Sequence, residues 1–330
     1  MTLYGSPGSL PPHENCRCRL RYILGTYSEI SYAREWLLPE WFYAEIMTND
    51  FVIDCSLNHP VAEWAGWYGP PQDQKKIAVV LNGVTSHTPR CGLYNTVVGS
   101  QKWKELLIYG RSQFMGTPFE TQYGASIEPV PEEAILGVVP FWTDVNFYTP
   151  GDVKEDYFLF LSRATAYKGL AQALELAGER KLHLKIVPGL GHASHTVELE
   201  QHRPQIEAAI ARGAKIDVVA IPQTSQHHQL KRELYRRARA LLAPVQCHEP
   251  FGLTLIEALA CGTPVIASRM GSFPEIIKPG ETGFLCRNKA EYLEAIDHLG
   301  DLPAGAPRAD AEARWHYLRA ASDYMKLLEK

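Results

Sequence analysis

The second half of the chain alternates between short, wholly apolar runs and longer amphipathic segments. Residues 157–161 form a continuous apolar run, which is typical of a parallel strand buried on both faces. Residues 182–189, 215–221 and 265–267 read as further strands, and residues 170–177 as a helix. This alternation predicts a doubly wound parallel domain, whose ligand lies beyond the carboxyl ends of the strands.

The first half of the chain has a weaker pattern. Residues 50–56 and 76–84 read as short strands. After Pro150-Gly151 the chain passes through a charged stretch into a strong strand, so we place a domain boundary there. We therefore expect three parts, residues 1–150, residues 151–308 and a C-terminal helix within residues 309–330.

Two carboxylates stand eight positions apart around a predicted helix start, Glu249 and Glu257. Residues 252–261 are nearly all apolar and are followed by Gly262 and Pro264, which predicts a buried helix that ends there. Glu257 is the only charge on this helix, and an unpaired buried carboxylate is costly. It therefore needs a partner, which a pair of sugar hydroxyls would supply.

Two cations, Arg163 and Lys168, stand in the loop between the strand at 157–161 and the helix at 170–177. Positive side chains beside a helix N-terminus suit a nucleoside diphosphate. Alone, the pair would read as two solvated surface cations. Together with the two glutamates downstream, it favours a phosphate-binding role.

Composition narrows the class of protein. The 330 residues have room for two domains, and 45% hydrophobic with 21% charged residues is typical of a soluble globular chain. The net charge of −4 gives no basic field, so nucleic acid is not predicted as a partner. No apolar run approaches 18 residues and no signal-peptide pattern opens the chain, which predicts a cytoplasmic location and leaves room for peripheral membrane contact.

The cysteines and one short cluster bear on metal chemistry. The seven cysteines are odd in number and scattered, which indicates free thiols. His13, Cys16 and Cys18 could ligate a metal ion, but no second ligand pair follows at a zinc-site spacing. We interpret the cluster as a polar loop and predict no metal site.

The stretch from residue 243 to residue 285 carries a specific signature. It contains Glu249 and Glu257, then Gly-Thr-Pro-Val-Ile at 262–266, Pro-Glu at 274–275 and Gly-Glu-Thr-Gly-Phe at 280–284. It closely resembles the donor-binding signature of the retaining glycosyltransferases of family 4, which have the GT-B fold. The loop at 162–169 is also similar to the family's Gly-Arg-x-x-x-x-Lys-Gly, with Ser162 in place of the first glycine.

The resemblance covers about residues 130–330 and implies an architecture. Two Rossmann-like doubly wound domains would face a cleft, the first on the acceptor side and the second binding the donor. The C-terminal helix would pack back on the first domain. The family's first strand, glycine-rich loop, helix and second strand have no counterpart here, so the N-terminal domain is expected to be reduced, unless the chain as given lacks its beginning.

On the acceptor side the resemblance is thin. Ile53 and Cys55 stand where the family has histidines, and Asn82 replaces the histidine beside the reacting sugar. Asn82 could donate a hydrogen bond there or simply form a turn, but it cannot act as an acid or base at neutral pH. His59 and His87 are the other acceptor-side candidates, although a loop histidine is more often solvated.

The activity implied by the resemblance is retaining, metal-independent transfer from a nucleoside-diphosphate sugar, with no further cofactor. Arg163 and Lys168 would hold the diphosphate, Glu257 the ribose hydroxyls and Glu249 the donor sugar. The backbone N–H groups at the helix start would bind phosphate or sugar hydroxyls. They belong to Phe251, Gly252, Leu253 and Thr254. The family shows no obvious protein nucleophile, so attack from the leaving-group face is the expected route to retention.

Other functions stay open at this point. A sugar-nucleotide epimerase would need acid–base residues in the cleft, and a phosphorylase would need a pyridoxal lysine, for which no local signature exists. The replaced histidines and the short first domain also fit a nucleotide-sugar binding protein without transfer activity, or one chain of an oligomer or heteromeric enzyme. The acceptor, the donor sugar and its base are not identified by the sequence.

Overall fold

The computed structural model describes only part of the chain, and that part forms two compact units. The described residues are 2–5, 19–22, 52–54, 77–81, 96–118, 120–124, 126–127, 129–189, 198–221 and 227–328. Unit 1 comprises residues 1–98 and 130–137, and unit 2 comprises residues 99–129 and 138–330. The predicted boundary near residue 150 stays a prediction about domain organisation.

Unit 1 is built on two sheets. Strands β1 (Thr2–Gly5) and β2 (Arg19–Tyr22) form one of them. The other has the order β3-β4-β5-β6. Its strands are β3 (Val52–Asp54), β4 (Ile77–Leu81), β5 (Thr96–Val98) and β6 (Ile135–Val138). The strands predicted at 50–56 and 76–84 are confirmed in their cores.

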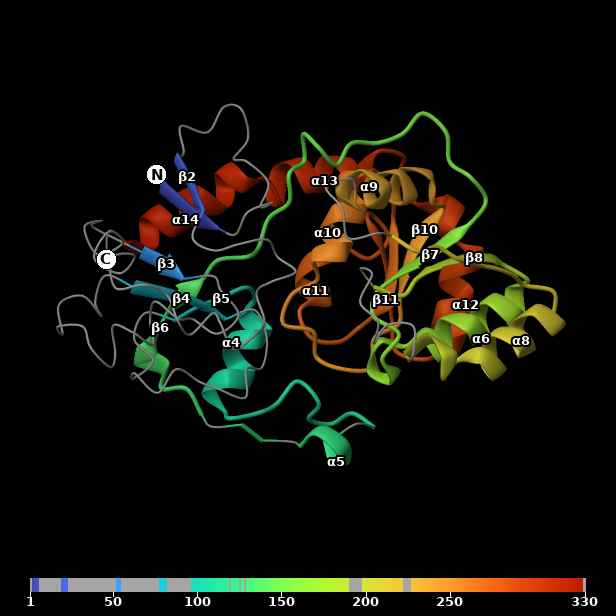
Figure 1. The fold of residues 1–330 in the computed structure, drawn as a ribbon, viewed down its shortest axis with the longest axis horizontal. Coiled ribbons are helices and arrows are strands. Elements are labelled where there is room, and N and C mark those ends of the chain that lie inside the picture. The colour runs from blue at the N-terminus through green and yellow to red at the C-terminus, as the bar shows by residue number, and fades with distance from the viewer. Residues whose placement is uncertain are drawn as a thin grey trace. The chain divides into compact units, whose positions relative to one another are not determined.

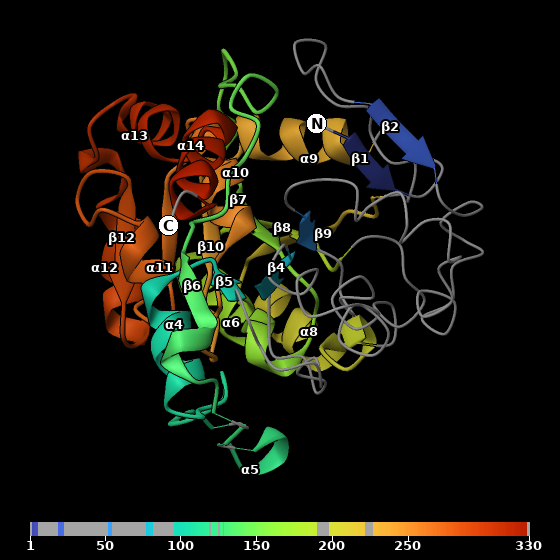
Figure 2. The same ribbon diagram turned by 90° about the vertical axis from the view of Figure 1, so that its left-hand side faces the viewer.

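Unit 2 is a doubly wound domain around a six-stranded sheet of order β12-β11-β10-β7-β8-β9, in which all neighbouring strands are parallel (Figures 1 and 2). The strands are β7 (Phe158–Leu161), β8 (His183–Val187), β9 (Lys215–Val218), β10 (Ala240–Ala243), β11 (Val265–Ser268) and β12 (Gly283–Cys286). The strand order reverses between β7 and β10, so the loops that follow these two strands meet at the switch point. The α/β prediction is confirmed.

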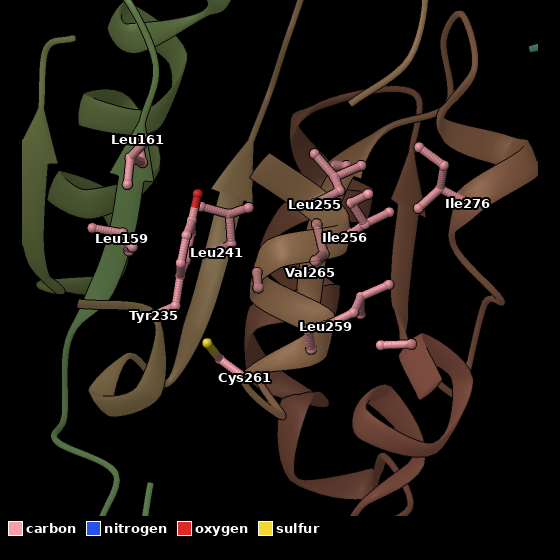
Figure 3. Packing of buried hydrophobic residues seen from close by; sticks show 14 of the residues in the cluster. Leu159, Leu161, Tyr235, Leu241, Leu255, Ile256, Leu259, Cys261, Val265 and Ile276 are labelled. Carbon is pink, nitrogen blue, oxygen red and sulfur yellow. The ribbon is translucent and has the colours of Figure 1, made fainter. Parts of the chain in front are cut away.

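Helices cover both faces of this sheet and bury two apolar clusters. One face packs against α9 (His227–Arg237), α10 (Leu253–Ala260) and α13 (Ala306–Arg314). The other packs against α6 (Leu170–Arg180), α8 (Arg203–Ala211) and α12 (Lys289–Asp297). Alternation along β7 explains this: Leu159 and Leu161 point to the first face, whereas Phe158 and Phe160 point to the second. Figure 3 shows the first cluster, in which α10 packs its apolar side chains against the strands.

Residues 99–129 belong to unit 2. They contain α4 (Gln101–Ile108), capped at its start by the Ser100 side chain, and the single turn α5 (Glu120–Tyr123). Short turns complete unit 2: η3 (Ala166–Lys168) precedes α6, α11 (Phe273–Ile276) precedes β12, and η4 (Leu299–Asp301) follows α12. In unit 1, the turn η2 (Glu132–Ala134) precedes β6.

The C-terminal segment differs from the single helix that we expected. It forms α13 and α14 (Tyr317–Leu328), with a break at Trp315 and His316. The Thr143 N–H donates to the Trp315 carbonyl at 2.9 Å and Thr143 bridges to His316, so the backbone leaves the helix there to pair with another segment. That α14 packs back on the first domain stays a prediction.

Candidate functional site

The loops after β7 and β10 lie side by side at the switch point of unit 2. Gly169, at the end of the β7 loop, has a left-handed backbone with φ of 80°. A Cβ atom added there would overlap the Pro244 carbonyl of the β10 loop. The Gln246 N–H also donates to the Tyr167 carbonyl at 2.7 Å. These contacts fix the two loops together, so residues far apart in the sequence share one site.

The Lys168 ammonium and the Glu249 carboxylate form an ion pair across these loops. Both side chains are largely buried, with 17% and 16% of their surface exposed. Burial lowers the pKa of Lys168, but the charge and hydrogen bond of Glu249 outweigh it and leave that pKa raised. Lys168 is therefore a cation at neutral pH. The Cys247 thiol lies 3.4 Å from the same carboxylate oxygen, and burial followed by the charge of Glu249 raises the pKa of Cys247 far above neutral.

Arg163 lies beside this pair with its charge available. It is exposed, and its guanidinium donates to the Tyr167 hydroxyl at 2.7 Å. Within the described parts of the chain, no carboxylate pairs with it. The structure thus brings Arg163, Lys168 and Glu249 to one end of the sheet, as a diphosphate-binding site requires.

The loop that carries Glu249 is braced from two sides. Ser272 donates its N–H to the Glu249 carbonyl at 3.1 Å and its hydroxyl to the Phe251 carbonyl. Ser100 donates its hydroxyl to the Pro250 carbonyl at 2.6 Å. The sequence analysis did not single out these serines.

A segment of residues 111–117 also covers this loop. His248 donates its backbone N–H to the Gln113 carbonyl at 2.7 Å, and its ring Nε2 lies 3.1 Å from the Met115 carbonyl. Phe114 packs edge-to-face on Tyr167 with ring centroids 5.2 Å apart, and both rest against Cys247. The short motif Pro274-Glu275 takes part as well, because the Glu275 carboxylate accepts the N–H groups of Gln101 and Lys102 at the start of α4.

The N-terminus of α10 faces the same end of the sheet. The first N–H groups of any helix have no partner within it, and here the first intrahelical bond runs from the Leu255 N–H to the Gly252 carbonyl at 3.0 Å. The Phe251 ring is buried against Phe141, whereas Leu253 is half exposed. The backbone at Phe251, Gly252, Leu253 and Thr254 is therefore placed to receive an anion.

Glu257 has protein partners that the sequence analysis missed. Lys231 lies 2.9 Å from Oε1 and 2.8 Å from Oε2, the Tyr235 hydroxyl donates to Oε2 at 2.9 Å, and the Tyr148 hydroxyl donates to Oε1 at 3.2 Å. The sequence analysis named a pair of sugar hydroxyls as the partner that Glu257 needs. In the structure, Lys231 already balances its charge. The available signal was the four-residue spacing of Lys231 and Tyr235, which puts both on one face of α9.

The structure does not describe the remaining predicted residues. Asn82, His59, His87 and the cluster of His13, Cys16 and Cys18 fall outside the described residues. Among the residues that the structure does describe, no group of three or more His, Cys, Asp or Glu side chains could hold a metal ion. In the same residues, no helix is long and apolar enough to cross a membrane.

Comparison with known proteins defines the class to which this fold and site belong. Residues 147–314, half of the chain, match the family model described as glycosyl transferases group 1. The chain belongs to this family, as the resemblance predicted.

Several relatives share the same region. The chain is 30% identical over 200 residues to D-inositol 3-phosphate glycosyltransferase of Mycobacterium tuberculosis, covering 56% of this chain and 39% of the relative. It is 27% identical over 170 residues to alpha-maltose-1-phosphate synthase of Mycolicibacterium smegmatis, covering 52% and 40%. Each match thus spans about two fifths of the relative's length.

Solved structures agree in fold. The sucrose-phosphate synthase of Thermosynechococcus elongatus matches with a TM-score of 0.65 at 17% identity, covering 99% of this chain and 88% of that one. Anabaena HepE in complex with UDP-glucose matches with a TM-score of 0.64 at 15% identity, covering 94% and 86%. A glycosyltransferase of Rickettsia africae matches with a TM-score of 0.65 at 17% identity, covering 94% and 85%. These likenesses confirm the GT-B glycosyltransferase fold class.

Proposed function

We propose that the protein transfers a glycosyl group from a nucleoside-diphosphate sugar to an acceptor, with retention of configuration. The observation that carries this proposal is the meeting of Arg163, Lys168 and Glu249 at the switch point of unit 2. Membership of the group 1 glycosyltransferases supports it. The solved structures of HepE with UDP-glucose support a nucleotide sugar as the donor.

The charges of the site suit the departure of a nucleoside diphosphate. Lys168 is paired with Glu249 without a ligand, and a diphosphate would compete for its ammonium while Arg163 adds a second cation. As the bond between the sugar C1 and the β-phosphate oxygen breaks, negative charge grows on that oxygen beside two cations and the N-terminus of α10. Because these groups already supply the positive charge, we propose that the transfer needs no metal ion and no cofactor beyond the nucleotide sugar.

The carboxylates take the other roles. Glu249, released from Lys168, would face the donor sugar and stabilise the positive charge that develops on its ring. The acceptor hydroxyl would attack C1 from the face that the diphosphate leaves, and its proton would pass to the departing phosphate oxygen. One C–O bond breaks, another forms on the same face, and configuration is retained. Glu257 would bind the ribose.

The first test is a thermal-shift panel of UDP, GDP, ADP and their common sugar conjugates. A ligand at about 100 times its Kd adds roughly 2.7 kcal/mol to the free energy of unfolding, which raises the Tm by about 5–10 °C in a domain of this size. We expect one nucleotide family to give this shift, and Arg163→Ala to abolish most of it. Arg203→Ala is the matched control, because Arg203 is an exposed arginine paired with Glu200 and should leave the shift unchanged.

Turnover separates a transferase from a binding protein. We expect the sugar conjugate of the binding nucleotide to be consumed, slowly by water and faster with an acceptor, and NMR of the new glycosidic bond to show the anomeric configuration of the donor. Absence of a shift with every nucleotide would refute the donor site. Binding without consumption across an acceptor screen would instead favour the nucleotide-sugar binding protein.

A further inference from the structure

The Glu257 carboxylate has no acceptor position left for a ligand. An ionised carboxylate offers roughly four lone-pair directions. Oε1 accepts hydrogen bonds from Lys231 and Tyr148. Oε2 accepts a hydrogen bond from Tyr235 and also lies beside the Lys231 ammonium. A ribose diol could therefore reach Glu257 only by displacing one of these donors.

Two of the donors are poorly placed to leave. Tyr235 is fully buried and Lys231 is 9% exposed, and both stand on α9. Thr263, just after α10, donates its hydroxyl to the Tyr235 carbonyl, which ties the end of α9 to that helix. Removing Lys231 from the carboxylate would leave a buried charge unpaired, the most costly of the three changes.

Tyr148 can leave without losing its hydrogen bonding. Its contact with Glu257 is the longest of the set, and the same hydroxyl lies 3.2 Å from His228 Nδ1. Burial lowers the pKa of His228, as do the charges of His227 and Lys231, so the ring is neutral at pH 7. Its Nδ1 can accept a hydrogen bond in the tautomer that carries the proton on Nε2. A hydroxyl has one proton, so Tyr148 can donate to His228 or to Glu257, but not to both at once.

The backbone around Tyr148 stays in place during such an exchange. The Arg308 guanidinium donates to the carbonyls of Tyr148, Val145 and Ala260, at 2.7 Å for Tyr148 and 2.8 Å for the other two. This fixes the Tyr148 main chain to the end of α10, the helix that carries Glu257. Only the phenol group of Tyr148 has to move.

We propose that a ribose diol takes the acceptor position that Tyr148 occupies on Glu257, while Lys231 and Tyr235 hold the carboxylate in its orientation. The inference rests on the proposed nucleotide-binding function. Lys231 and Tyr235 are positioning residues, and Tyr148 is a built-in competitor whose hydroxyl is retained by His228 when the ligand binds. The Glu257 side chain is buried except for 12% of its surface. The diol would reach the carboxylate through this exposed part.

The proposal predicts opposite effects from two Tyr→Phe changes on one carboxylate. Tyr148→Phe removes the competitor and should tighten binding of UDP by about 3–10-fold, the range expected for one hydrogen bond. Tyr235→Phe removes a support and should weaken binding or leave it unchanged. Both effects should be absent with 2′,3′-dideoxyuridine diphosphate, which has no diol. Isothermal titration of the wild type and both variants with UDP and its dideoxy form gives the six affinities, and GDP, ADP and their dideoxy forms are run in parallel to cover the base.

Lys231 provides an independent readout. Lys231→Met should weaken UDP binding by at least 10-fold, because it removes the cation that holds the Glu257 carboxylate in place. Lys231→Arg should keep most of the affinity, because it keeps the charge. Lys185→Met is the matched control, since Lys185 is paired with Glu155 and should leave UDP binding unchanged.

The outcomes separate this inference from the proposed function. If the wild type binds no nucleoside diphosphate, both fail. If the wild type binds UDP and its dideoxy form equally, or if Tyr148→Phe weakens UDP binding, nucleotide binding stands and the exchange at Glu257 is refuted. Tighter binding by Tyr148→Phe that is confined to the ribonucleotide supports it.

Discussion

Lys168 and Glu249 form a largely buried ion pair at the candidate site. Each is more than four-fifths buried, and a buried charge is costly without a partner of opposite sign, so each depends on the other. An incoming diphosphate would offer Lys168 a stronger partner and release Glu249 towards the sugar. Without ligand, the ion pair would stabilise the fold. With a diphosphate bound, Lys168 would hold the phosphate and Glu249 would face the sugar.

Removing one charge of this pair should cost more stability than removing both. We expect Lys168→Met to lower the free energy of unfolding by about 2–4 kcal/mol, because it leaves a largely buried carboxylate unpaired. Lys168→Met combined with Glu249→Gln should cost less than Lys168→Met alone. Urea unfolding of the two single variants and the double variant measures the coupling. Strictly additive losses would show that the two side chains do not depend on each other.

His248 should give the protein a stability that falls in mild acid. Its Nδ1 accepts the Gly271 N–H at 3.2 Å, so Nε2 carries the proton and donates to the Met115 carbonyl. Burial lowers the pKa of His248, the bond to Met115 raises it in part, and the charge of Lys102 lowers it. The unfolded state then binds a proton at higher pH than the folded state, so the free energy of unfolding falls as pH drops below about 6.5.

Paired histidine variants isolate this effect. Urea unfolding between pH 5 and pH 8 should show a shallower rise of stability with pH in His248→Gln than in the wild type. His298 is the control of opposite sign, because its hydrogen bond to Asp301 raises the pKa of His298 and its contribution is lost as pH rises. His298→Gln should therefore steepen the rise. An unchanged profile in His248→Gln would mean that the ring is not held neutral by the fold.

Sequence alone identified some of these residues and missed others for a physical reason. Arg163, Lys168, Glu249 and Glu257 stand in fixed spacings around strand ends, where a parallel sheet concentrates ligand contacts. Lys231 does not stand at a strand end, and a lysine on an amphipathic helix is usually solvated. Its partner lies on another helix, and only the packing of α9 against α10 brings the two together.

At the scale of elements, the turns that join strand to helix set the geometry of the site. The η3 turn ends at Gly169, whose left-handed backbone starts α6 and lies against the Pro244 carbonyl. Hydrophobic periodicity predicted the strand and the helix on either side. It could not predict the close approach to Pro244, which depends on how β7 and β10 pair.

Gly169→Ala should therefore damage both the fold and the site. Gly280→Ala is a matched control, because Gly280 has φ of 77° and its added Cβ atom would meet nothing within 4 Å. Both variants incur about 1–2 kcal/mol for a left-handed alanine. Only Gly169→Ala also forces the two loops apart, which should add roughly 2 kcal/mol and abolish the nucleotide-induced Tm shift. Equal losses in urea unfolding would show that the loops are not in tight contact.

The C-terminal helices show where local pattern is insufficient. Residues 309–328 have apolar spacing typical of one helix, yet the backbone breaks at Trp315 and His316 to pair with Thr143. A backbone pairing with a residue about 170 positions earlier leaves no trace in the local sequence. The strands of unit 2, by contrast, were predictable because each is a short apolar run of its own.

At the scale of the whole molecule, unit 2 is assembled from two separate stretches of chain. Residues 99–129 join it from the first half of the sequence, leaving residues 130–137 to supply most of strand β6 of unit 1. Their contacts converge on the loop that carries Glu249, through Ser100 on Pro250 and through the two carbonyls that His248 reaches. The loop that carries Glu249 is thus supported by residues outside the segment that matches the family model.

A fragment of residues 138–330 should consequently be less stable than one of residues 99–330. The shorter fragment loses the hydrogen bonds made by Ser100 and Glu275 and to Gln113 and Met115, together with the Phe114 contact on Tyr167. At about 1 kcal/mol for each net hydrogen bond, the five bonds amount to roughly 5 kcal/mol, or about 10–20 °C in Tm. Calorimetry of both fragments measures it, and Ser100→Ala in the longer fragment should reproduce a part of the loss. Equal melting temperatures would mean that residues 99–129 contact the loop that carries Glu249 without stabilising it. A lower Tm together with a weaker nucleotide shift would show that this stretch holds Glu249 in place for the donor.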